Sequence, residues 1–365
     1  MKYQKCLLCL LVLVSCTKPK QFLGDISYED IQNCRESKKL IYGDGNISII
    51  PLESKRECLT GRVGKIVLTN EYYFIWSNNS ILQFLRNGKF IRAIGNYGRG
   101  PQEYLDINDF TINEKEKIVF IADSQNIIQY NFEGDFISKY AVNLFWKFDV
   151  TDEGHYVINP INFFGNEPNK LIIINSSGDT LVKFKNSILY QPKSLSLWPQ
   201  RKSILKIDKN YIYHQQFCDT IFTVNTNNLT LDYRYSFNFG NHKITNQALS
   251  EGSKAIGQSV YISDITEDLN YIYLACNNKG SIIKSLIDKN SGKFYKPDFY
   301  IPEIKFQFWP KWQYQDSLLI DIVSASHIIE MKDSLPKSNL DSMIGKLNEF
   351  SNSLLIIVNS GKRVK

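Results

Sequence analysis

Residues 80–95, SILQFLRNGKFIRAIG, contain the unit from which this chain is built. Two apolar, alternating segments flank the dipeptide Asn87-Gly88, and Asn and Gly accept the positive φ angles that a tight hairpin turn requires. The pattern therefore predicts a β-hairpin. Four later segments repeat it with Gly or Asn at the turn: NIIQYNFEGDFISKYA (126–141), KLIIINSSGDTLVKFK (170–185), TIFTVNTNNLTLDYRY (220–235) and SIIKSLIDKNSGKFYK (281–296).

A further apolar strand precedes each hairpin, for example KIVLTNEYYFIW before the first and NYIYLAC before the last. The unit is thus a meander of about four short strands that recurs about every 45–65 residues, which is the spacing of β-propeller blades. The early strand NISIIPLE (46–53) would complete a sixth blade with LLIDIVSA (318–325) and SLLIIVNS (353–360). We therefore expect an all-β fold, a six-bladed β-propeller closed by both chain ends. An irregular β-sandwich is the alternative.

One short helix near the C-terminus is expected to interrupt the strands. The segment SNLDSMIGKLNEF (338–350) begins with a candidate N-cap, Ser338. Apolar residues then recur at helical spacing, at Leu340, Met343, Ile344 and Leu347. We expect this helix to pack on the last blade.

The first residues resemble a bacterial lipoprotein signal peptide. Residues 1–15 carry Lys2 and Lys5, followed by an apolar run that is too short to cross a bilayer. The sequence LVSC that ends at Cys16 resembles a lipobox, which implies that Cys16 is diacylated and becomes the mature N-terminus. Two acyl chains give stable membrane anchoring. An ordinary secretory peptide cut nearby is the alternative.

The chain is thus expected to have three parts: a signal peptide (1–15), a lipid-anchored tether (16–45) with a helical turn within YEDIQNCRESKKL, and one propeller domain (46–365). The basic tail TKPKQ after Cys16 favours the periplasmic face of the membrane but leaves the choice of face open. A disulfide between Cys34 and Cys58 fits an exported protein, and buried free thiols fit equally.

The composition is typical of a folded globular protein, with 43% apolar and 22% charged residues. The formal net charge is +6, and removal of residues 1–15, whose charged side chains are Lys2 and Lys5, would lower it to +4. Basic residues are spread along the chain, so we expect no nucleic-acid partner.

The segment GNYGRGPQEYLDINDF (95–110) is rich in glycine but does not fit a phosphate-binding loop. A P-loop needs G-x-x-x-x-G-K-[ST] before a helix, and a Rossmann loop needs a helix directly after G-x-G-x-x-G. Here no lysine follows the glycines, and strand-like alternation comes next.

Four segments resemble the six-bladed β-propeller lipoproteins of Bacteroidetes, which are TolB-like or NHL-like propellers. They are IIPLE, GRVGKIVLTNEYYFIW, the run from ILQFLRNGKF to GPQEYLDINDF, and LNEFSNSLLIIVNS. This chain departs from the family pattern at Gln102, where Gly is usual, and at Ser353, where Pro is usual. The resemblance implies a propeller tethered to the outer membrane and no established reaction.

The same loop is expected to be a structural corner between two blades. Its glycines permit a sharp reversal of the chain, and Pro101 fixes its own φ angle. Arg99 and Glu103 would form an ion pair, and Tyr104 would pack between the two blades. The alternative is that Arg99 and Glu103 point into the central funnel and bind a ligand. The candidate ligand-binding residues are Arg99, Glu103, Tyr104, Trp146 and Trp309.

Signatures of catalysis are weak. The histidines form neither H-x-x-x-H nor H-E-x-x-H, no G-x-S-x-G is present, and we expect no metal and no cofactor. We expect a non-enzymatic binding or interaction lipoprotein of the cell envelope that Cys16 holds on the membrane. The further partner of this lipoprotein would be a glycan, a peptide or an envelope protein. A propeller enzyme, a glycan lyase or hydrolase acting at the funnel, is the alternative.

Overall fold

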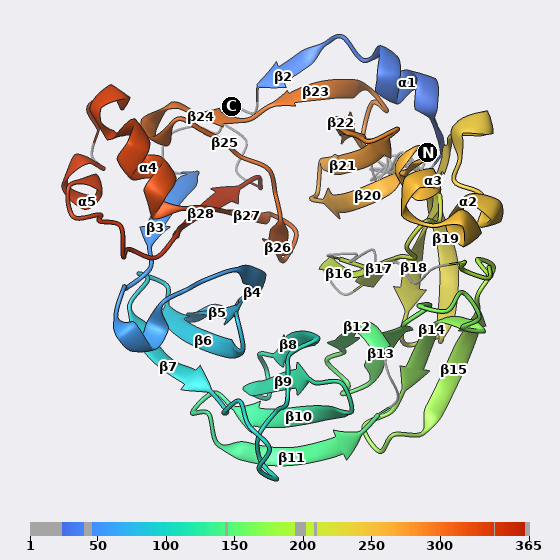
Figure 1. Ribbon diagram of the computed structural model, residues 1–365, viewed down its shortest axis with the longest axis horizontal. Helices are drawn as coiled ribbons and strands as arrows, with labels where there is room; N and C mark the ends of the chain where they lie inside the picture. The colour runs from blue at the N-terminus through green and yellow to red at the C-terminus, as the bar shows by residue number, and fades with distance from the viewer. Residues whose placement is uncertain are drawn as a thin grey trace, which may run out of the picture.

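The computed structural model describes residues 24–39, 46–142, 145–193, 202–207, 210–338 and 340–361. Six sheets stand radially around a central axis, each with its first strand innermost (Figure 1). This arrangement confirms the expected six-bladed β-propeller.

The blades are numbered here in chain order, with their strands given from the axis outward. Blade 1 contains β4 (Val63–Leu68), β5 (Tyr72–Ser77), β6 (Ser80–Leu85) and β7 (Phe90–Ile94); blade 2 contains β8 (Asp109–Asn113), β9 (Ile118–Ala122), β10 (Asn126–Asn131) and β11 (Phe136–Ala141); blade 3 contains β12 (Phe145–Val150), β13 (Tyr156–Pro160), β14 (Asn169–Ile174) and β15 (Thr180–Lys185).

The second half of the ring follows the same order. Blade 4 contains β16 (Ile204–Ile207), β17 (Asn210–His214), β18 (Thr220–Asn225) and β19 (Thr230–Asn238); blade 5 contains β20 (Val260–Glu267), β21 (Tyr271–Asn278), β22 (Ser281–Asp288) and β23 (Phe294–Asp298); blade 6 contains β26 (Trp312–Tyr314), β27 (Leu318–Val323), β28 (Leu354–Asn359) and β3 (Ile47–Pro51). A small hairpin of β24 (Tyr300–Ile301) and β25 (Phe306–Gln307) joins blades 5 and 6.

The five predicted hairpins are the outer two strands of blades 1 to 5. The turns of blades 1, 2, 3 and 5 use the expected residues, since Gly88, Gly134, Gly178 and Gly292 have positive φ angles. In blade 4 the positive φ falls on Leu229 and not on Asn227 or Asn228. Blade 6 is closed as predicted, because β3 from the N-terminal part pairs antiparallel with β28 from the C-terminal part.

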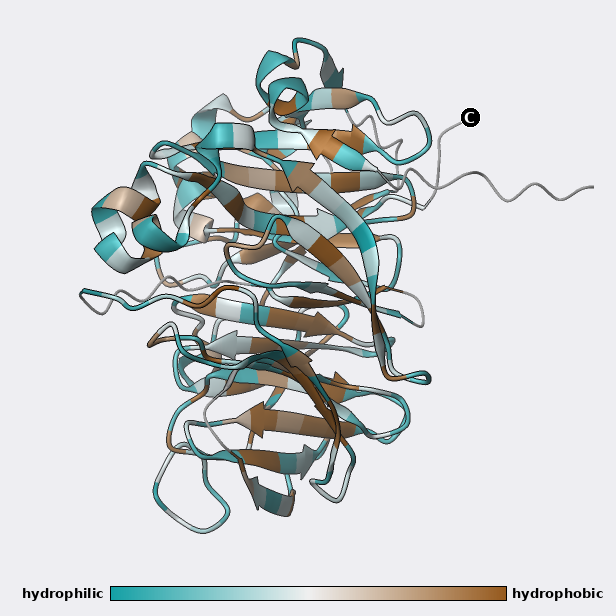
Figure 2. Cartoon of the chain, turned by 90° about the vertical axis from the view of Figure 1, so that its right-hand side faces the viewer, coloured by the Kyte–Doolittle hydropathy of each residue, from teal (hydrophilic) through white to brown (hydrophobic). Residues whose placement is uncertain are grey.

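Both faces of the second strands are mostly buried, for example in β5, β9 and β13, which explains why these strands read as nearly continuous apolar runs. Adjacent residues of β6 illustrate this: Ile81 belongs to the same apolar cluster as Phe110 of blade 2, whereas Leu82 belongs to the same cluster as Leu355 of blade 6. Apolar strands lie stacked between hydrophilic loops (Figure 2). The core is therefore a series of layers between blades rather than one central mass.

Residues 25–39 form an N-terminal strap across blades 4 and 5. Its strand β1 (Asp25–Ser27) pairs in parallel with β19, and its strand β2 (Ser37–Lys39) pairs in parallel with β23. Between them, helix α1 (Tyr28–Asn33) buries Tyr28 and Ile31. This part of the segment that we expected to act as a tether is therefore docked on the propeller, and it contains the expected helical turn.

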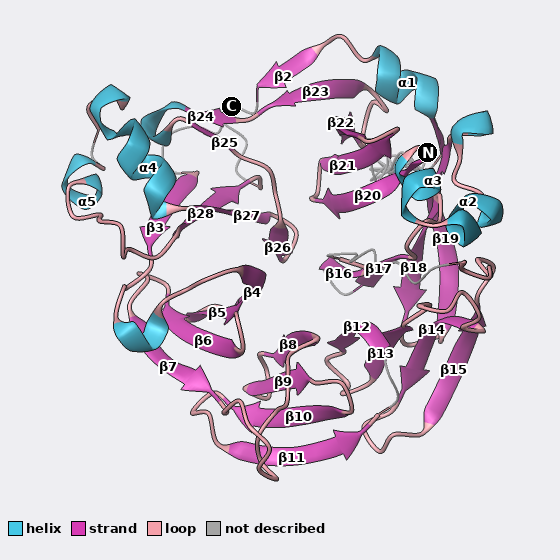
Figure 3. Cartoon of the chain, in the orientation of Figure 1, coloured by secondary structure: helices cyan, strands magenta, loops and turns pink. Residues whose placement is uncertain are grey.

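The remaining helices are short and lie at the rim of the ring (Figure 3). They are α2 (Asn246–Glu251), α3 (Ser253–Gly257), α4 (Ala325–Met331) and α5 (Asp341–Ile344). The helix expected over residues 338–350 is limited to α5, which Gly345 follows directly. Helices α2, α3 and α4 were not predicted. Within the described ranges, no helix has the length and apolar character needed to cross a bilayer.

The four cysteines of the described chain are free thiols. Cys34, Cys58 and Cys276 are buried, and the Sγ atom of Cys58 donates to the carbonyl of Glu53 at 3.1 Å. Of the two alternatives for Cys34 and Cys58, the structure thus shows buried thiols and not a disulfide.

Candidate functional site

A cavity of about 660 Å³ lies on the axis of the ring. Residues from the inner strands of blades 1, 2, 4 and 6, and from β12 and the turn that follows it in blade 3, line this central cavity. Radial packing explains why it exists, since the inner strands of six sheets cannot all meet at the axis. Charged side chains of both signs line it, among them Lys65, Glu114, Asp149, Lys202 and Lys206.

A chain of ionic contacts links the inner strands of blades 1, 2 and 3. Lys65 Nζ lies 2.9 Å from Asp109 Oδ1, and Lys147 Nζ lies 3.8 Å from the same oxygen. Asp109 is buried and also accepts the backbone N–H of Phe148 at 3.2 Å. Burial lowers the pKa of Lys147, and Asp109 opposes that shift. These contacts join blades and leave Lys65 on the wall of the cavity.

Asp149 faces the same cavity from β12. Its Oδ1 atom accepts the hydroxyl of Thr111 at 2.5 Å and the backbone N–H of Val150 at 2.8 Å. No lysine or arginine nitrogen of the described residues lies within 4.0 Å of this carboxylate. Burial raises the pKa of Asp149, and the charge of Lys65 opposes this shift without cancelling it. Asp149 is therefore a hydrogen-bonded carboxyl group with an elevated pKa on the wall of a cavity, a combination that is typical of functional sites.

Blade 4 contributes two lysines to the cavity. Lys202 is largely buried; its Nζ atom lies 3.1 Å from Asp264 Oδ1 and also contacts the hydroxyl of Thr266. Lys206 Nζ lies 2.7 Å from Asp152 Oδ1, and both of these side chains remain solvent-accessible. The exposed pair can separate at low cost, because surface ion pairs contribute little to stability. It is thus suited to exchange its internal contact for a contact with a ligand.

Polar groups and apolar side chains share the wall of the cavity. Ammonium groups, carboxylates, the Thr111 hydroxyl and the Trp312 and Tyr314 rings all lie on its wall. No group of three or more His, Cys, Asp or Glu side chains that could hold a metal ion occurs in the described part of the chain.

The glycine-rich loop that contains Gly95, Gly98 and Gly100 lies outside this cavity. It runs from β7, the outer strand of blade 1, to β8, the inner strand of blade 2. Lys139 of the outer strand β11 donates to the carbonyl of Glu103 at 3.1 Å, which locates this residue near the periphery of blade 2. Arg99, Glu103 and Tyr104 are not among the residues that line the central cavity.

The internal contacts of the loop differ from the expected ones. Within the described residues, Arg99 makes no ion pair with Glu103; the Glu103 Oε2 atom instead accepts the backbone N–H of Gly100 at 2.7 Å. An added Cβ at Gly98 would collide with that carboxylate. The positive φ angle falls on Gly95 and not on Gly98 or Gly100.

Tyr104 packs between blades as expected. It is buried against Tyr130 in a T-shaped contact, with ring centroids 6.4 Å apart, and burial raises its pKa to about 12. Tyr130 in turn donates its hydroxyl to the carbonyl of Gln102 at 2.6 Å. These contacts fix the loop against blade 2 and are consistent with a structural corner.

The two tryptophan candidates belong to other segments of the chain. Trp309 is buried, stacks on Phe299, and lines a second cavity beside blade 5. Trp146 belongs to β12. Cys16 lies outside the described residues.

Sequence reasoning did not single out Lys65, Lys202 or Lys206. The usable signal was weak: a charged residue stands at or beside the inner strands, in GRVGKIVL, DFTI and WKFDV. A charged residue at such a place is equally typical of the solvent-facing side of an alternating strand. Only the closed ring brings these positions together around one axis.

The fold and the cavity define the class of this protein, a six-bladed β-propeller with an axial cavity lined by charged and apolar residues. The chain belongs to the family described as "Domain of unknown function (DUF4934)", whose model matches residues 24–359.

Two solved structures are similar in fold. The crystal structure of a "Putative exported protein (BF0058)" from Bacteroides fragilis has 18% sequence identity and a TM-score of 0.73, and the match covers 93% of this chain and 99% of that one. A member of the DUF4221 family from Bacteroides vulgatus has 8% identity and a TM-score of 0.50, with 88% and 98% covered. A search of curated proteins finds no match.

Proposed function

We propose that this chain is an exported, lipid-anchored binding protein of the cell envelope that holds a small polar ligand in its central cavity. The observation that carries the proposal is the wall of that cavity, where Lys65, Asp149 and Lys206 from three different blades face the same space. A volume of about 660 Å³ falls within the range of small-molecule sites. The ligand would be a sugar, a sugar acid or an amino-acid derivative.

The cellular location rests on the N-terminal sequence and on a relative. The lipobox at Cys16 supports lipid anchoring to the outer membrane, and the printed name of the Bacteroides fragilis protein supports export. Substitution Cys16→Ala should move the protein from the membrane fraction to the soluble fraction. Retention in the membrane fraction would contradict the anchor.

The binding proposal is tested by a ligand screen followed by a matched pair of variants. Thermal shifts against a panel of sugars, sugar acids and amino acids should identify a ligand, and calorimetry should measure its Kd. Lys206→Met should weaken binding about tenfold or more because it removes a cavity charge. Lys243→Met removes a similar exposed ion pair, to Asp219 at 2.5 Å, away from the cavity and should leave Kd unchanged. Equal affinity in both variants would overturn the cavity as the site.

A second candidate function follows from Asp149. A buried carboxyl group whose pKa is raised is a candidate general acid, the kind of group that a glycan hydrolase or lyase requires. If the parent cleaves an oligosaccharide and Asp149→Asn does not, the protein is an enzyme. Binding without turnover supports the binding protein.

A further inference from the structure

The outer part of blade 5 is open. Strand β22 pairs with β23 only at Leu286↔Tyr295 and Ile287↔Phe294. In blade 1, by comparison, the equivalent pair β6 and β7 matches four residues on each strand. Blade 5 therefore lacks about half of its outermost ladder.

The reason is that β23 turns away to meet the N-terminal strap. Beyond Tyr295, Lys296 pairs in parallel with Ser37, and Asp298 pairs with Lys39. Residues 281–285 of β22 remain paired with β21 on one side, and no strand of the described chain pairs with their other side. An unpaired edge of this kind offers a row of backbone N–H and C=O groups to another strand.

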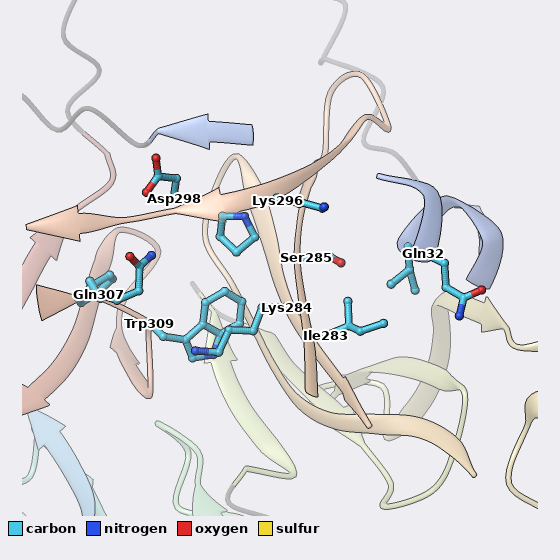
Figure 4. Close-up of a pocket in the computed structure, with 11 residues that line it drawn as sticks. Gln32, Ile283, Lys284, Ser285, Lys296, Asp298, Gln307 and Trp309 are labelled. Atoms are coloured by element: carbon cyan, nitrogen blue, oxygen red, sulfur yellow. The ribbon is translucent and has the colours of Figure 1, made fainter. Parts of the chain in front are cut away.

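A cavity of about 580 Å³ occupies this opening (Figure 4). Ile283, Lys284 and Ser285 of β22 lie on one side, and residues 296–298 of β23 lie on the other. Phe308 and Trp309 add an apolar wall, and Ile31 and Gln32 of α1 close one end. It shares no lining residue with the central cavity.

Two lysines give this cavity a positive character. Lys284 Nζ lies 4.9 Å from the centre of the Trp309 ring, and Lys296 extends from β23. Neither ammonium group has a carboxylate within 4.0 Å among the described residues. Asp298, the acidic residue of the wall, is thus not paired with either lysine. Both ammonium groups remain available to an anion.

Ser285 adds a hydroxyl group to the wall of this cavity. A hydroxyl can both donate and accept a hydrogen bond, so this side chain can pair with a peptide group that enters the opening.

We propose that the open edge of β22 binds an extended peptide segment of a partner protein, with an acidic side chain placed near Lys284 and Lys296. Backbone hydrogen bonds to residues 281–285 would add a strand to blade 5, and the apolar wall would receive an apolar side chain of the peptide. Recognition of this kind takes affinity from the main chain and specificity from alternate side chains. The proposal does not depend on the central cavity.

The test uses blocked five-residue peptides in which Val and Glu alternate, with binding measured by fluorescence anisotropy. Two control peptides share the length: one carries Lys in place of Glu, and one carries Pro at its centre. We expect the Val/Glu peptide to bind, the Lys peptide to bind about tenfold more weakly or worse, and the Pro peptide not to bind, because Pro cannot donate to a ladder.

The protein variants locate the site. Lys284→Glu combined with Lys296→Glu should reverse the preference in favour of the Lys peptide. Lys293→Glu makes the same type of substitution once on the same hairpin without lining the cavity, and should bind like the parent. Lys206→Met, which alters the central cavity, should also leave peptide binding unchanged.

Three results would overturn the proposal. The first is no binding of the Val/Glu peptide below about 1 mM. The second is equal binding of the Pro peptide, which would show that only the anionic side chains are recognised. The third is displacement of the Val/Glu peptide by free glucuronate at equal concentration, which would assign the cavity to a small carboxylated ligand.

Discussion

The two halves of the ring are assembled differently. Blades 1 to 3 are each folded from one continuous segment of chain, whereas blades 4, 5 and 6 each receive a strand from residues 25–51: β1 on β19, β2 on β23 and β3 on β28. The Tyr233 hydroxyl, for example, donates to Asp25, 208 residues away in the sequence. One half is stabilised by contacts near in sequence, and the other depends on the N-terminal segment.

The three added strands are not equivalent. Strand β3 is the fourth strand of blade 6 and pairs antiparallel at five positions. Asn352 secures it, donating to the carbonyls of Glu53 at 2.6 Å and Cys58 at 2.8 Å. Strands β1 and β2 are fifth strands that pair in parallel at three positions each. We therefore expect β3 to be essential for closing the ring and the strap to be accessory.

The largest effect should come from breaking blade 6. Deletion of residues 353–365 removes β28, which lies between β27 and β3 and is almost entirely buried. Cooperative thermal unfolding, followed by circular dichroism, should be lost. A chain that begins at residue 46 lacks the strap but keeps β3, and it should still unfold in one transition. A parent-like melt of the first variant would refute closure by both ends.

The next effect concerns the ionic cluster between blades 4 and 5. Glu267 is buried; its Oε2 atom lies 2.8 Å from Arg234 Nη2 and 2.5 Å from Lys289 Nζ. Glu267→Gln would leave two positive charges uncompensated and should lower the free energy of unfolding by about 3–5 kcal/mol. Urea denaturation at pH 7 measures this difference.

The same cluster predicts a pH dependence. Burial alone would raise the pKa of Glu267, but Lys289 and Arg234 outweigh it and hold the pKa below the usual value of 4.5. The stabilisation is therefore complete above the unfolded-state pKa and is lost as the pH falls through the lower folded-state pKa. The stability difference between parent and Glu267→Gln should shrink below pH 4.5. A constant difference would contradict the ionic origin.

The covered and bare sheet edges can be compared directly. Ile26 of the strap is buried against blade 4, whereas Ile137 on the outer strand of blade 2 is exposed. Ile26→Ala should cost about 2–4 kcal/mol of unfolding free energy because it leaves a cavity under the strap. Ile137→Ala should change it by about 0.5 kcal/mol or less. Similar values for both variants would show that the strap is not firmly docked.

The smallest effect tests the corner in the sequential half. Gly95 has a φ of +62°, and an added Cβ would lie 2.5 Å from the Tyr130 ring. Gly178 has a φ of +90° with no atom within 4 Å of such a Cβ. Gly95→Ala should destabilise by about 2–3 kcal/mol and Gly178→Ala by about 1 kcal/mol, measured by urea denaturation. Equal losses of unfolding free energy in the two variants would mean that backbone strain alone, and not the contact with Tyr130 of blade 2, requires glycine at position 95.

Much of the architecture was determined by the sequence itself. Hairpin turns such as Asn87-Gly88 need residues that accept positive φ, and sheets buried on both faces need apolar runs, so both features leave a readable local pattern. Closure by β3 could be read for the same reason, because NISIIPLE is an apolar strand with no partner nearby in the sequence. The sequence shows that the corner at residues 95–104 is rich in glycine. It does not show which of these glycines has the positive φ angle.

The sites were decided only by the tertiary structure. Lys65, Asp149 and Lys206 are far apart in the sequence and become neighbours only when the ring closes around its axis. The opening beside β22 exists because β23 pairs with Lys39 and its neighbours in the strap. No local sequence pattern predicts this pairing. Local propensity acts over a few residues, whereas a binding site is a convergence of side chains from distant segments, and that convergence is a property of the closed ring.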